Sequence, residues 1–480
     1  MKKGLLLLLL PVLCLTGYAQ DKWDLRRCVE YAIANNISVK QSDVQARLAA
    51  LTLEQSKLAQ LPTLGLNGSA GYSAGRNQDP TTYALITQGY VSNQYTLQAG
   101  INFFNFGSLR YNAQGNKYAL DAANAGTDKL RNDVSLNVAN AYLQFLLSYQ
   151  TEKTAELQMN QSQQQLEITR KQVSAGTLPE LNAAELESQV AQDSSAYVTA
   201  ISNVQQMVLN LKAYMSIDAA APFALDTPSV DKIPIETLAE LQPEMVYSMA
   251  LANQPQQKAD AFQLQAAHKY VAANKSAMYP TFSLFGALGT SYTNQSVNIN
   301  GYTLTPPPLN SPPVGTVKIG TTSYDVFSTA PSVNYIYDKP DYFNQLNQNF
   351  RQQAGLQVNV PILNGGTLKI NYRRAQANLR NYELQQQLDN LTLKQNIYQA
   401  YNLAVAALQK FEANKKTVAA TGRSYDYAQK RYKVGILNTI DLLTNQNNYY
   451  KAKIDLLYSQ FDYVFKMKVV EFYKGLGIKL

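Results

Sequence analysis

The feature that most constrains the fold of this chain is an internal repeat with a constant spacing. Gly107 and Gly176 lie 69 positions apart, and Gly366 and Gly435 are separated by the same 69 positions. The sequences around these glycines correspond in the two halves of the chain: Asn102–Arg110 with Pro361–Lys369, and Lys171–Leu178 with Lys430–Leu437. An ungapped segment of equal length in both halves predicts the same rigid element in each.

Each repeated segment has the composition of one very long helix. Residues 108–175 and 367–434 contain no proline, are rich in Ala, Leu, Gln, Asn and Lys, and precede a glycine suited to a helix C-terminus. Some 68 helical residues would extend roughly 100 Å, and a helix of that length needs lateral partners such as a coiled coil. Four shorter helical stretches are predicted beside them: about 24–61, 179–215, 243–279 and 438–474.

Upstream of each long segment the hydrophobic period changes from about 3.6 to about 2, which predicts β-strands. The strands fall at about 62–106 in the first half and about 280–365 in the second, where Leu64 and Leu66, for example, alternate with small or polar residues. Strands of about 9–11 residues with this pattern are typical of outer-membrane barrels. A soluble hairpin is the alternative.

Four strands are too few for a closed barrel, since about eight is the smallest number that fills its interior. Open strand edges are not viable in lipid, because each unpaired backbone group there costs several kcal/mol. We therefore expect the chain to pool strands with copies of itself. About eight strands from a dimer, or twelve from a trimer, are the simplest closures.

The N-terminus predicts export. Lys2 and Lys3 precede an apolar run that ends at Gly17-Tyr18-Ala19, so residues 1–19 are interpreted as a secretory signal peptide. No later stretch has about 18 uninterrupted apolar residues, so no membrane-spanning helix is expected. The rest divides into a first structural repeat at 20–215, an inter-repeat linker at 216–242 with several prolines, and a second structural repeat at 243–480.

Composition argues against most catalytic and nucleic-acid-binding classes. The formal net charge of +8 comes without a long basic run, so no nucleic-acid partner is expected. One His and two Cys cannot supply a zinc site of three or four such ligands, and Cys28 is interpreted as a small buried hydrophobe. Gly71–Gly75 matches G-x-S-x-G, but the only candidate base, His268, lies in a Gln/Ala-rich helix. We expect no catalytic residue, no metal and no cofactor.

The duplicated helix–strand–strand–long helix–helix unit, the signal peptide and the two Gly turns together resemble the TolC-like outer-membrane efflux proteins. The resemblance covers essentially the whole mature chain. It implies an α+β membrane protein: a homotrimer with a 12-stranded β-barrel, four strands per chain, in outer-membrane lipid, continued by a long α-helical barrel in the periplasm. It also implies a periplasmic adaptor (membrane fusion) protein, an inner-membrane RND or ABC transporter as partners, and an equatorial position for residues 216–242.

The same resemblance indicates site residues near the two turns. Gly176 and Thr177, with Gly435 and Ile436, are expected to be the tips that meet the adaptor. Asp441 is expected at the periplasmic constriction, where a threefold assembly would form a ring of three carboxylates. A solvated carboxylate that complements the helix dipole is the alternative reading of Asp441.

The chain departs from the family pattern at the constriction. Thr444 stands at the second acidic position, and Leu437 replaces a basic residue. Asn182 replaces the partner aspartate of Tyr432, so a neutral Tyr432–Asn182 hydrogen bond remains open as the substitute for a charged lock.

Aromatic residues on the predicted strands or at their ends are expected to form a girdle at the lipid–water boundary, with ordinary strand packing as the alternative. They are Tyr72, Tyr95, Phe103, Phe104, Phe106, Tyr279, Phe282 and Tyr292. The proline-rich stretch from about Asn294 to Phe350 is expected to be an external loop that narrows the mouth or a variable decoration.

These features favour a passive outer-membrane exit duct of a tripartite efflux pump for small molecules, opened by its partners. The outer-membrane channel of a type I protein secretion system is an alternative within the same class. An exported helical scaffold or adhesin is an alternative of another class, and an exported hydrolase is the weakest.

Overall fold

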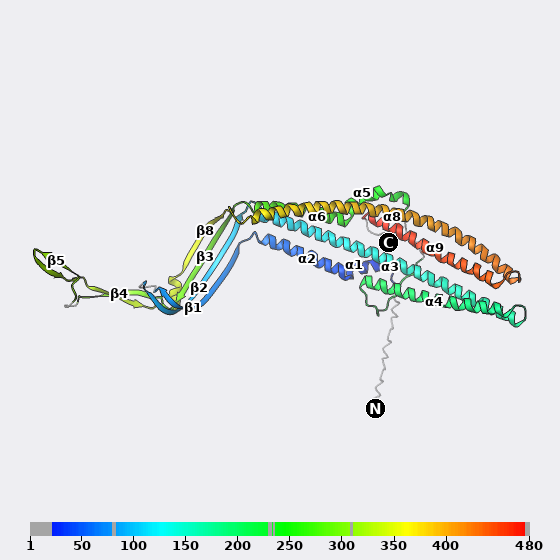
Figure 1. Ribbon diagram of the computed structural model, residues 1–480, viewed down its shortest axis with the longest axis horizontal. Helices are drawn as coiled ribbons and strands as arrows, with labels where there is room; N and C mark the ends of the chain where they lie inside the picture. Colours follow the sequence, from blue (N-terminus) through cyan, green and yellow to red (C-terminus); the bar gives the residue numbers. More distant parts are fainter. Residues whose placement is uncertain (1–21, 79–82, 229–232, 234–235, 308–310, 476–480) are drawn as a thin grey trace, which may run out of the picture. The chain divides into compact units, whose positions relative to one another are not determined.

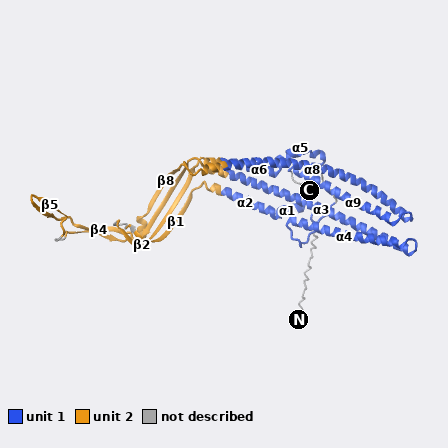
Figure 2. Ribbon diagram, viewed as in Figure 1, with its two compact units in different colours: residues 1–54, 114–271, 374–480 blue, residues 55–113, 272–373 orange. Residues whose placement is uncertain are grey.

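The computed structural model describes residues 22–78, 83–228, 233, 236–307 and 311–475. The predicted signal peptide at 1–19 lies outside them. The chain forms two compact units, which Figure 2 shows in different colours. The first unit contains residues 1–54, 114–271 and 374–480, and the second contains 55–113 and 272–373.

Long helices dominate the first unit. Helices α3 (Ser108–Ser174) and α8 (Thr367–Lys433) each have 67 residues, within a residue of the predicted bounds. Figure 1 shows α4 (Glu180–Met215) running back beside α3, and α9 (Thr439–Tyr473) running back beside α8. The proline-free segments therefore form helical hairpins, which give each long helix the lateral partner that its length requires.

Two of the predicted shorter helices are each divided in two. The first consists of α1 (Leu25–Asn35) and α2 (Ile37–Leu58), separated by Asn36, whose side-chain oxygen accepts the N–H of Ser38 at 2.9 Å. The second consists of α5 (Pro243–Asn253) and α6 (Pro255–Ser276). Pro255 disfavours helical backbone at Gln254, which has ψ 129°. Prediction of one continuous helix was wrong at both places.

The core of the first unit lies around the middle of α3. Tyr142 and Leu146 are 1% exposed and pack against Cys28 of α1 and Met215 of α4, both fully buried. The interpretation of Cys28 as a buried hydrophobe is confirmed, and burial raises the pKa of its thiol to about 12. A second cluster joins α5, α8, α9 and the 3₁₀ helix η2 (Leu238–Leu241).

The second unit contains a four-stranded antiparallel sheet. Its strands are β1 (Thr63–Gln78), β2 (Leu85–Phe104), β3 (Thr281–Thr293) and β8 (Arg351–Asn359), in the order β1-β2-β3-β8. Three of them are longer than the predicted 9–11 residues. The central β2–β3 pair joins the two repeats, and β1 and β8 form the two edges of the sheet.

The register gives the sheet one apolar face. Leu64 pairs with Ala99, Leu66 with Leu97, and Leu284 with both Ile101 and Leu356, so these side chains share a face. The opposite face carries mainly hydroxyl, amide and small residues, such as Asn67, Thr96, Gln98, Ser283 and Gln357. The predicted alternation is therefore confirmed in β1, β2 and β8, whereas it is less regular in β3, which carries Phe285 on the polar face.

The stretch after β3 is more ordered than the loop that the sequence predicted. β4 (Asn298–Thr305) pairs with β7 (Ser332–Asp338), and β5 (Gly315–Ile319) pairs with β6 (Thr322–Val326). Helix α7 (Tyr342–Gln348) follows and leads into β8. Among the described residues, the prolines that suggested a loop lie outside the strands, where no ladder hydrogen bond is lost: Pro306, Pro307, Pro312, Pro313, Pro331 and Pro340.

None of the helices in the described ranges has an 18-residue stretch apolar enough to cross a membrane.

Candidate functional site

Both long helices end in the same turn. Gly176 and Gly435 each have φ +73°, the left-handed conformation that favours glycine. In each turn the glycine N–H donates to the carbonyl three residues earlier at 2.9 Å. The next N–H, of Thr177 or Ile436, donates to the carbonyl five residues earlier at 2.9 and 3.0 Å, respectively. The two predicted tips are thus the same C-terminal cap, used once in each repeat.

Apolar side chains gather at the second tip. Val434 and Ile436 are each 67% exposed and flank Gly435. Thr177, at the position equivalent to Ile436, has its hydroxyl bonded to the carbonyl of Gln172 at 2.8 Å. In the single chain, the second tip therefore has an exposed apolar surface. At the same position of the first tip, the hydroxyl of Thr177 is hydrogen-bonded within the turn.

Asp441 and Thr444 lie on the exposed side of α9 near its start. Asn438 caps the N-terminus of the helix, and its side-chain oxygen accepts the N–H of Asp441 at 2.7 Å. Asp441 and Thr444 are both exposed, and residues three apart on a helix are neighbours on one face. The hydroxyl of Thr444 donates to the carbonyl of Ile440 at 2.8 Å.

Tyr432, near the end of α8, is buried between helices and does not share the exposure of Asp441 and Thr444. It is 8% exposed, and its hydroxyl lies 3.3 Å from Oγ1 of Thr169 on α3 and 3.4 Å from Oγ1 of Thr439 on α9. The Tyr432–Asn182 hydrogen bond that the sequence left open is not formed within the described residues. Asn182 lies in the first turn of α4, where its N–H donates to Pro179.

A buried aspartate that the sequence did not single out as functional lies farther along α4. Asp193 is 4% exposed and accepts three hydrogen bonds from neutral side chains. Oδ2 accepts from the hydroxyl of Ser162 at 2.6 Å, and Oδ1 accepts from Gln158 and Gln189 at 2.8 and 2.9 Å. Ser162 and Gln158 belong to α3, so the carboxylate links the two helices of the first hairpin.

Amides of α9 extend this network to the second repeat. Nε2 of Gln446, which is 2% exposed, donates to the hydroxyl of Ser162 at 2.9 Å. Oδ1 of Asn447 accepts from Gln189 at 3.3 Å. The network therefore holds α3, α4 and α9 together. The sequence carries no signal for this network beyond the many amide side chains on these helices, because the residues that form it are far apart in the chain.

A second buried carboxyl lies on α6, outside the predicted site. Asp260 is 7% exposed, and Nε2 of Gln256 donates to its Oδ1 at 2.9 Å. Burial is the main reason that the pKa of Asp260 is raised to about 6, and the neighbouring charge of Asp389 on α8 adds to the shift. The bond from Gln256 partly opposes both effects.

The predicted girdle residues fall into two groups at opposite ends of the sheet. Phe103, Phe104, Phe106, Tyr279 and Phe282 form one cluster, with ring centroids 4.8 to 6.4 Å apart.

The other group consists of Tyr72, Tyr95 and Tyr292, which share a face of the sheet. Tyr342 of α7, which the sequence did not indicate, joins this group. Its ring centroid is 4.7 Å from that of Tyr292, and its hydroxyl is 3.1 Å from that of Tyr95.

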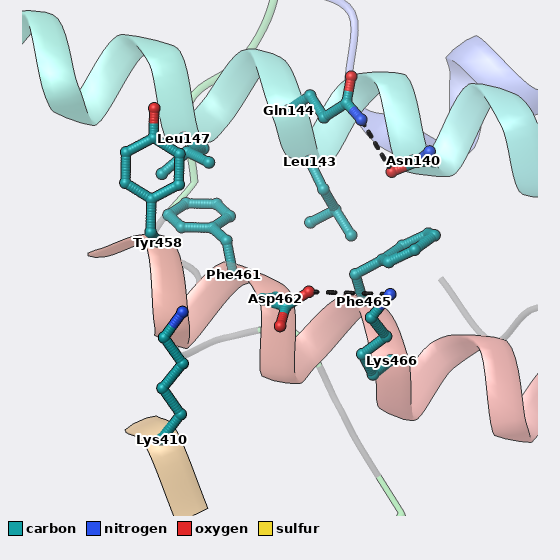
Figure 3. Close-up of a pocket in the computed structure, with 10 residues that line it drawn as sticks. All are labelled: Asn140, Leu143, Gln144, Leu147, Lys410, Tyr458, Phe461, Asp462, Phe465 and Lys466. Carbon is teal, nitrogen blue, oxygen red and sulfur yellow. Dashed lines mark hydrogen bonds and ion pairs between the residues drawn. The ribbon is translucent and has the colours of Figure 1, made fainter. Parts of the chain in front are cut away.

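A cavity of about 370 Å³ opens between α3, α8 and α9 (Figure 3). Leu143 and Phe461 contribute to its apolar lining, and Lys410 lines it from α8. Asp462 and Lys466 lie near each other on α9, with 3.9 Å between Oδ1 and Nζ. Among the described residues no group of three or more His, Cys, Asp or Glu could hold a metal ion.

The chain matches a family model over most of its length. The model is described as "Outer membrane efflux protein" and matches residues 29–216 and 246–464, which correspond to the two repeats.

Individual relatives agree with the family match. The outer membrane efflux protein BepC of Brucella suis is 23% identical over 454 residues, which cover 94% of this chain and 85% of the relative. The toluene efflux pump outer membrane protein TtgC of Pseudomonas putida is 19% identical over 468 residues, covering 94% and 82% of the two chains.

Solved structures share the fold. CusC superimposes with a TM-score of 0.74 at 16% identity, covering 95% of this chain and 92% of that one. The CmeC outer membrane channel of Campylobacter jejuni gives 0.70 at 17% identity, covering 95% and 86%. The helix-rich α+β fold and the resemblance inferred from the sequence are confirmed. The chain belongs to the outer membrane efflux protein family.

Proposed function

We propose that three copies of this chain form a passive exit duct in the outer membrane for a tripartite efflux pump. The observation that carries the proposal is the four-stranded sheet with one apolar face and two open edges, β1 and β8. Lipid leaves no water to satisfy open edges, so each β8 pairs with β1 of a neighbouring copy. Three copies give about twelve strands, enough to enclose a water-filled interior lined by the polar face.

The spacing of the aromatic groups supports a girdle at two interfaces. Phe282 and Tyr292 belong to opposite groups and are ten residues apart on β3. That is about 33 Å along a strand, or about 25 Å of height when the strand is tilted by about 40°. The apolar band of an outer-membrane barrel is about 25 Å tall.

The two Gly turns are the surfaces that meet a periplasmic adaptor. Both tips have the same backbone cap, and Val434 and Ile436 leave apolar area uncovered at the second. Exposed apolar patches at a fixed turn favour a protein partner. The adaptor in turn connects the duct to an inner-membrane transporter of the RND or ABC class.

Asp441 and Thr444 line the periplasmic constriction. Threefold symmetry brings three copies of the exposed Asp441 carboxylate together, which favours cations over anions. Tyr432 contributes by packing within the chain, through its contacts with Thr169 and Thr439, because its hydroxyl is enclosed. The cargo is proposed to be small molecules, because relatives matching 94% of the chain are named for toluene and antibiotic efflux pumps.

The test is the assembly state and conductance of the mature protein. Purified in detergent, it should be a trimer by light scattering and should form ion-conducting pores in planar bilayers. A monodisperse monomer that stays soluble without detergent would contradict the proposal.

A further inference from the structure

Strands β4 and β7 form one amphipathic ribbon and β5 and β6 form a second, and these two ribbons are called the arm here. In the first ribbon Tyr302 pairs with Tyr335 and Leu304 with Val333, so these four side chains share a face. Ile299 and Tyr337 also pair and lie on this face. The other face carries mainly polar residues, among them Thr303, Thr305, Ser332 and Asn334.

The second ribbon repeats the pattern. Val317 pairs with Tyr324, and Ile319 and Val326 lie on the same face, while Lys318 and Asp325 lie on the other. In the single chain all six apolar-face residues of the first ribbon are 45–63% exposed, and these four of the second are 42–68% exposed. A two-stranded ribbon is marginally stable alone, so an uncovered apolar face of this extent calls for a partner.

The root of the arm is fixed to the sheet. The hydroxyl of Thr290 in β3 donates to the carbonyl of Leu346 in α7 at 2.6 Å. Nδ2 of Asn298, the first residue of β4, donates to Oε1 of Gln348 in α7 at 3.1 Å. The arm therefore starts from a constrained position beside β8, the edge strand that the proposed trimer joins to a neighbour.

We propose that the apolar faces of the arms of three copies pack against one another as a cap over the outer mouth of the duct. The inference rests on the proposed trimer, which tethers three identical arms at one rim and so gives each an effective concentration of about millimolar for the others. Tyrosine suits such a contact, because its ring is buried while its hydroxyl stays hydrated.

The charged residues of the arm favour contact with the arms of other copies over contact with a lipid surface. A segment that lies on a membrane typically carries Lys and Arg on its polar face. The polar face of the first ribbon has none and carries Asp338, and Lys318 of the second ribbon is balanced by Asp325.

Cysteine cross-linking tests the cap with a matched pair of variants. Tyr335→Cys lies on the apolar face, and Asn334→Cys, one residue away, lies on the polar face. The native Cys28 is fully buried and does not compete for oxidation. On mild oxidation of the detergent-purified trimer, Tyr335→Cys should yield at least about ten times more covalent dimer than Asn334→Cys, and its pores should conduct less when oxidised.

The outcomes separate this inference from the proposed function. A trimer, verified by light scattering, in which both variants cross-link equally or not at all would overturn the cap and leave the duct intact. A monomer would overturn both. A fluorophore attached through Tyr335→Cys, in vesicles of phosphatidylcholine containing brominated lipid, should not be quenched. Strong quenching would assign the apolar face to lipid and also overturn the cap.

Discussion

At the scale of single residues, two aspartates near the tips differ because one side chain is exposed and the other is enclosed. Asp441 is exposed, and among the described residues it has no ion pair. Asp193 is 4% exposed and accepts hydrogen bonds from three neutral donors. The carboxylate of Asp441 is therefore open to solvent, whereas that of Asp193 links helices α3 and α4.

Asp441→Asn should reduce the cation selectivity of the pore and weaken block by multivalent cations, because the proposed trimer would lose a ring of three negative charges. The reversal potential in a salt gradient measures this. Asp455→Asn is the matched control, since Asp455 is also exposed on α9 and lies 14 residues farther from the turn, about 21 Å away. An unchanged reversal potential in Asp441→Asn would place this carboxylate outside the constriction, as a solvated helix-start residue.

Asp193→Ala should destabilise the helical unit by about 3 kcal/mol, because it leaves the buried donors of Ser162, Gln158 and Gln189 without their acceptor. The thermal unfolding midpoint of the purified protein should fall, while Asp455→Ala should leave it nearly unchanged. Equal midpoints for the two variants would show that the network contributes little to stability. Asp193 is thus unsuited as a neutral control for ion selectivity.

Stability should also depend on pH through Asp260. Its folded pKa of about 6 lies above the usual value of an aspartate, so the folded state prefers the protonated form. The loss of stability is absent below about pH 4, grows as the pH rises, and is complete above about pH 6, where it amounts to about 3 kcal/mol. Asp260→Asn should raise the unfolding midpoint at pH 8 and leave it unchanged at pH 4. A gain of the same size at both values would contradict this assignment.

At the scale of elements, a substitution at Gly435 can test whether the turn of the second hairpin serves docking or folding. A residue with a Cβ at φ +73° costs about 1 kcal/mol, but no other atom lies within 4 Å of the place its Cβ would take. Gly435→Trp should therefore abolish resistance to exported compounds in cells while the trimer still assembles. Gly435→Asn, which tolerates the left-handed conformation, should retain export. Loss of the trimer in Gly435→Trp would assign the glycine to folding.

The elements also show what a sequence can predict. The bounds of α3 and α8 and the alternation of the strands follow from local composition and period, and both were predicted. The break at Gln254 is readable in the sequence, because Pro255 disfavours helical backbone at the residue before it. The partner of Tyr432 was not predictable, because it depends on which face of α3 packs against α8. The pairing of β4 with β7 was missed because the prolines between the strands suggested a loop.

At the scale of the whole molecule, the family places this chain in the outer membrane, with its helical part in the periplasm, as the sequence predicted. The orientation of the sheet in the assembly then follows from its two faces. Leu97, on the apolar face of β2, should contact lipid, and its neighbour Gln98, on the polar face, should line the water-filled interior.

This orientation predicts opposite reactivity for neighbouring positions in the assembled protein. In reconstituted vesicles, Gln98→Cys should react with a water-soluble, membrane-impermeant maleimide, because the reagent enters the interior of the barrel. Leu97→Cys should react at least about tenfold more slowly, because lipid excludes the reagent. Native Cys28 is fully buried, so the background is low. Equal rates would mean that both faces meet water, as in a soluble sheet, and reversed rates would mean that the apolar face lines the interior.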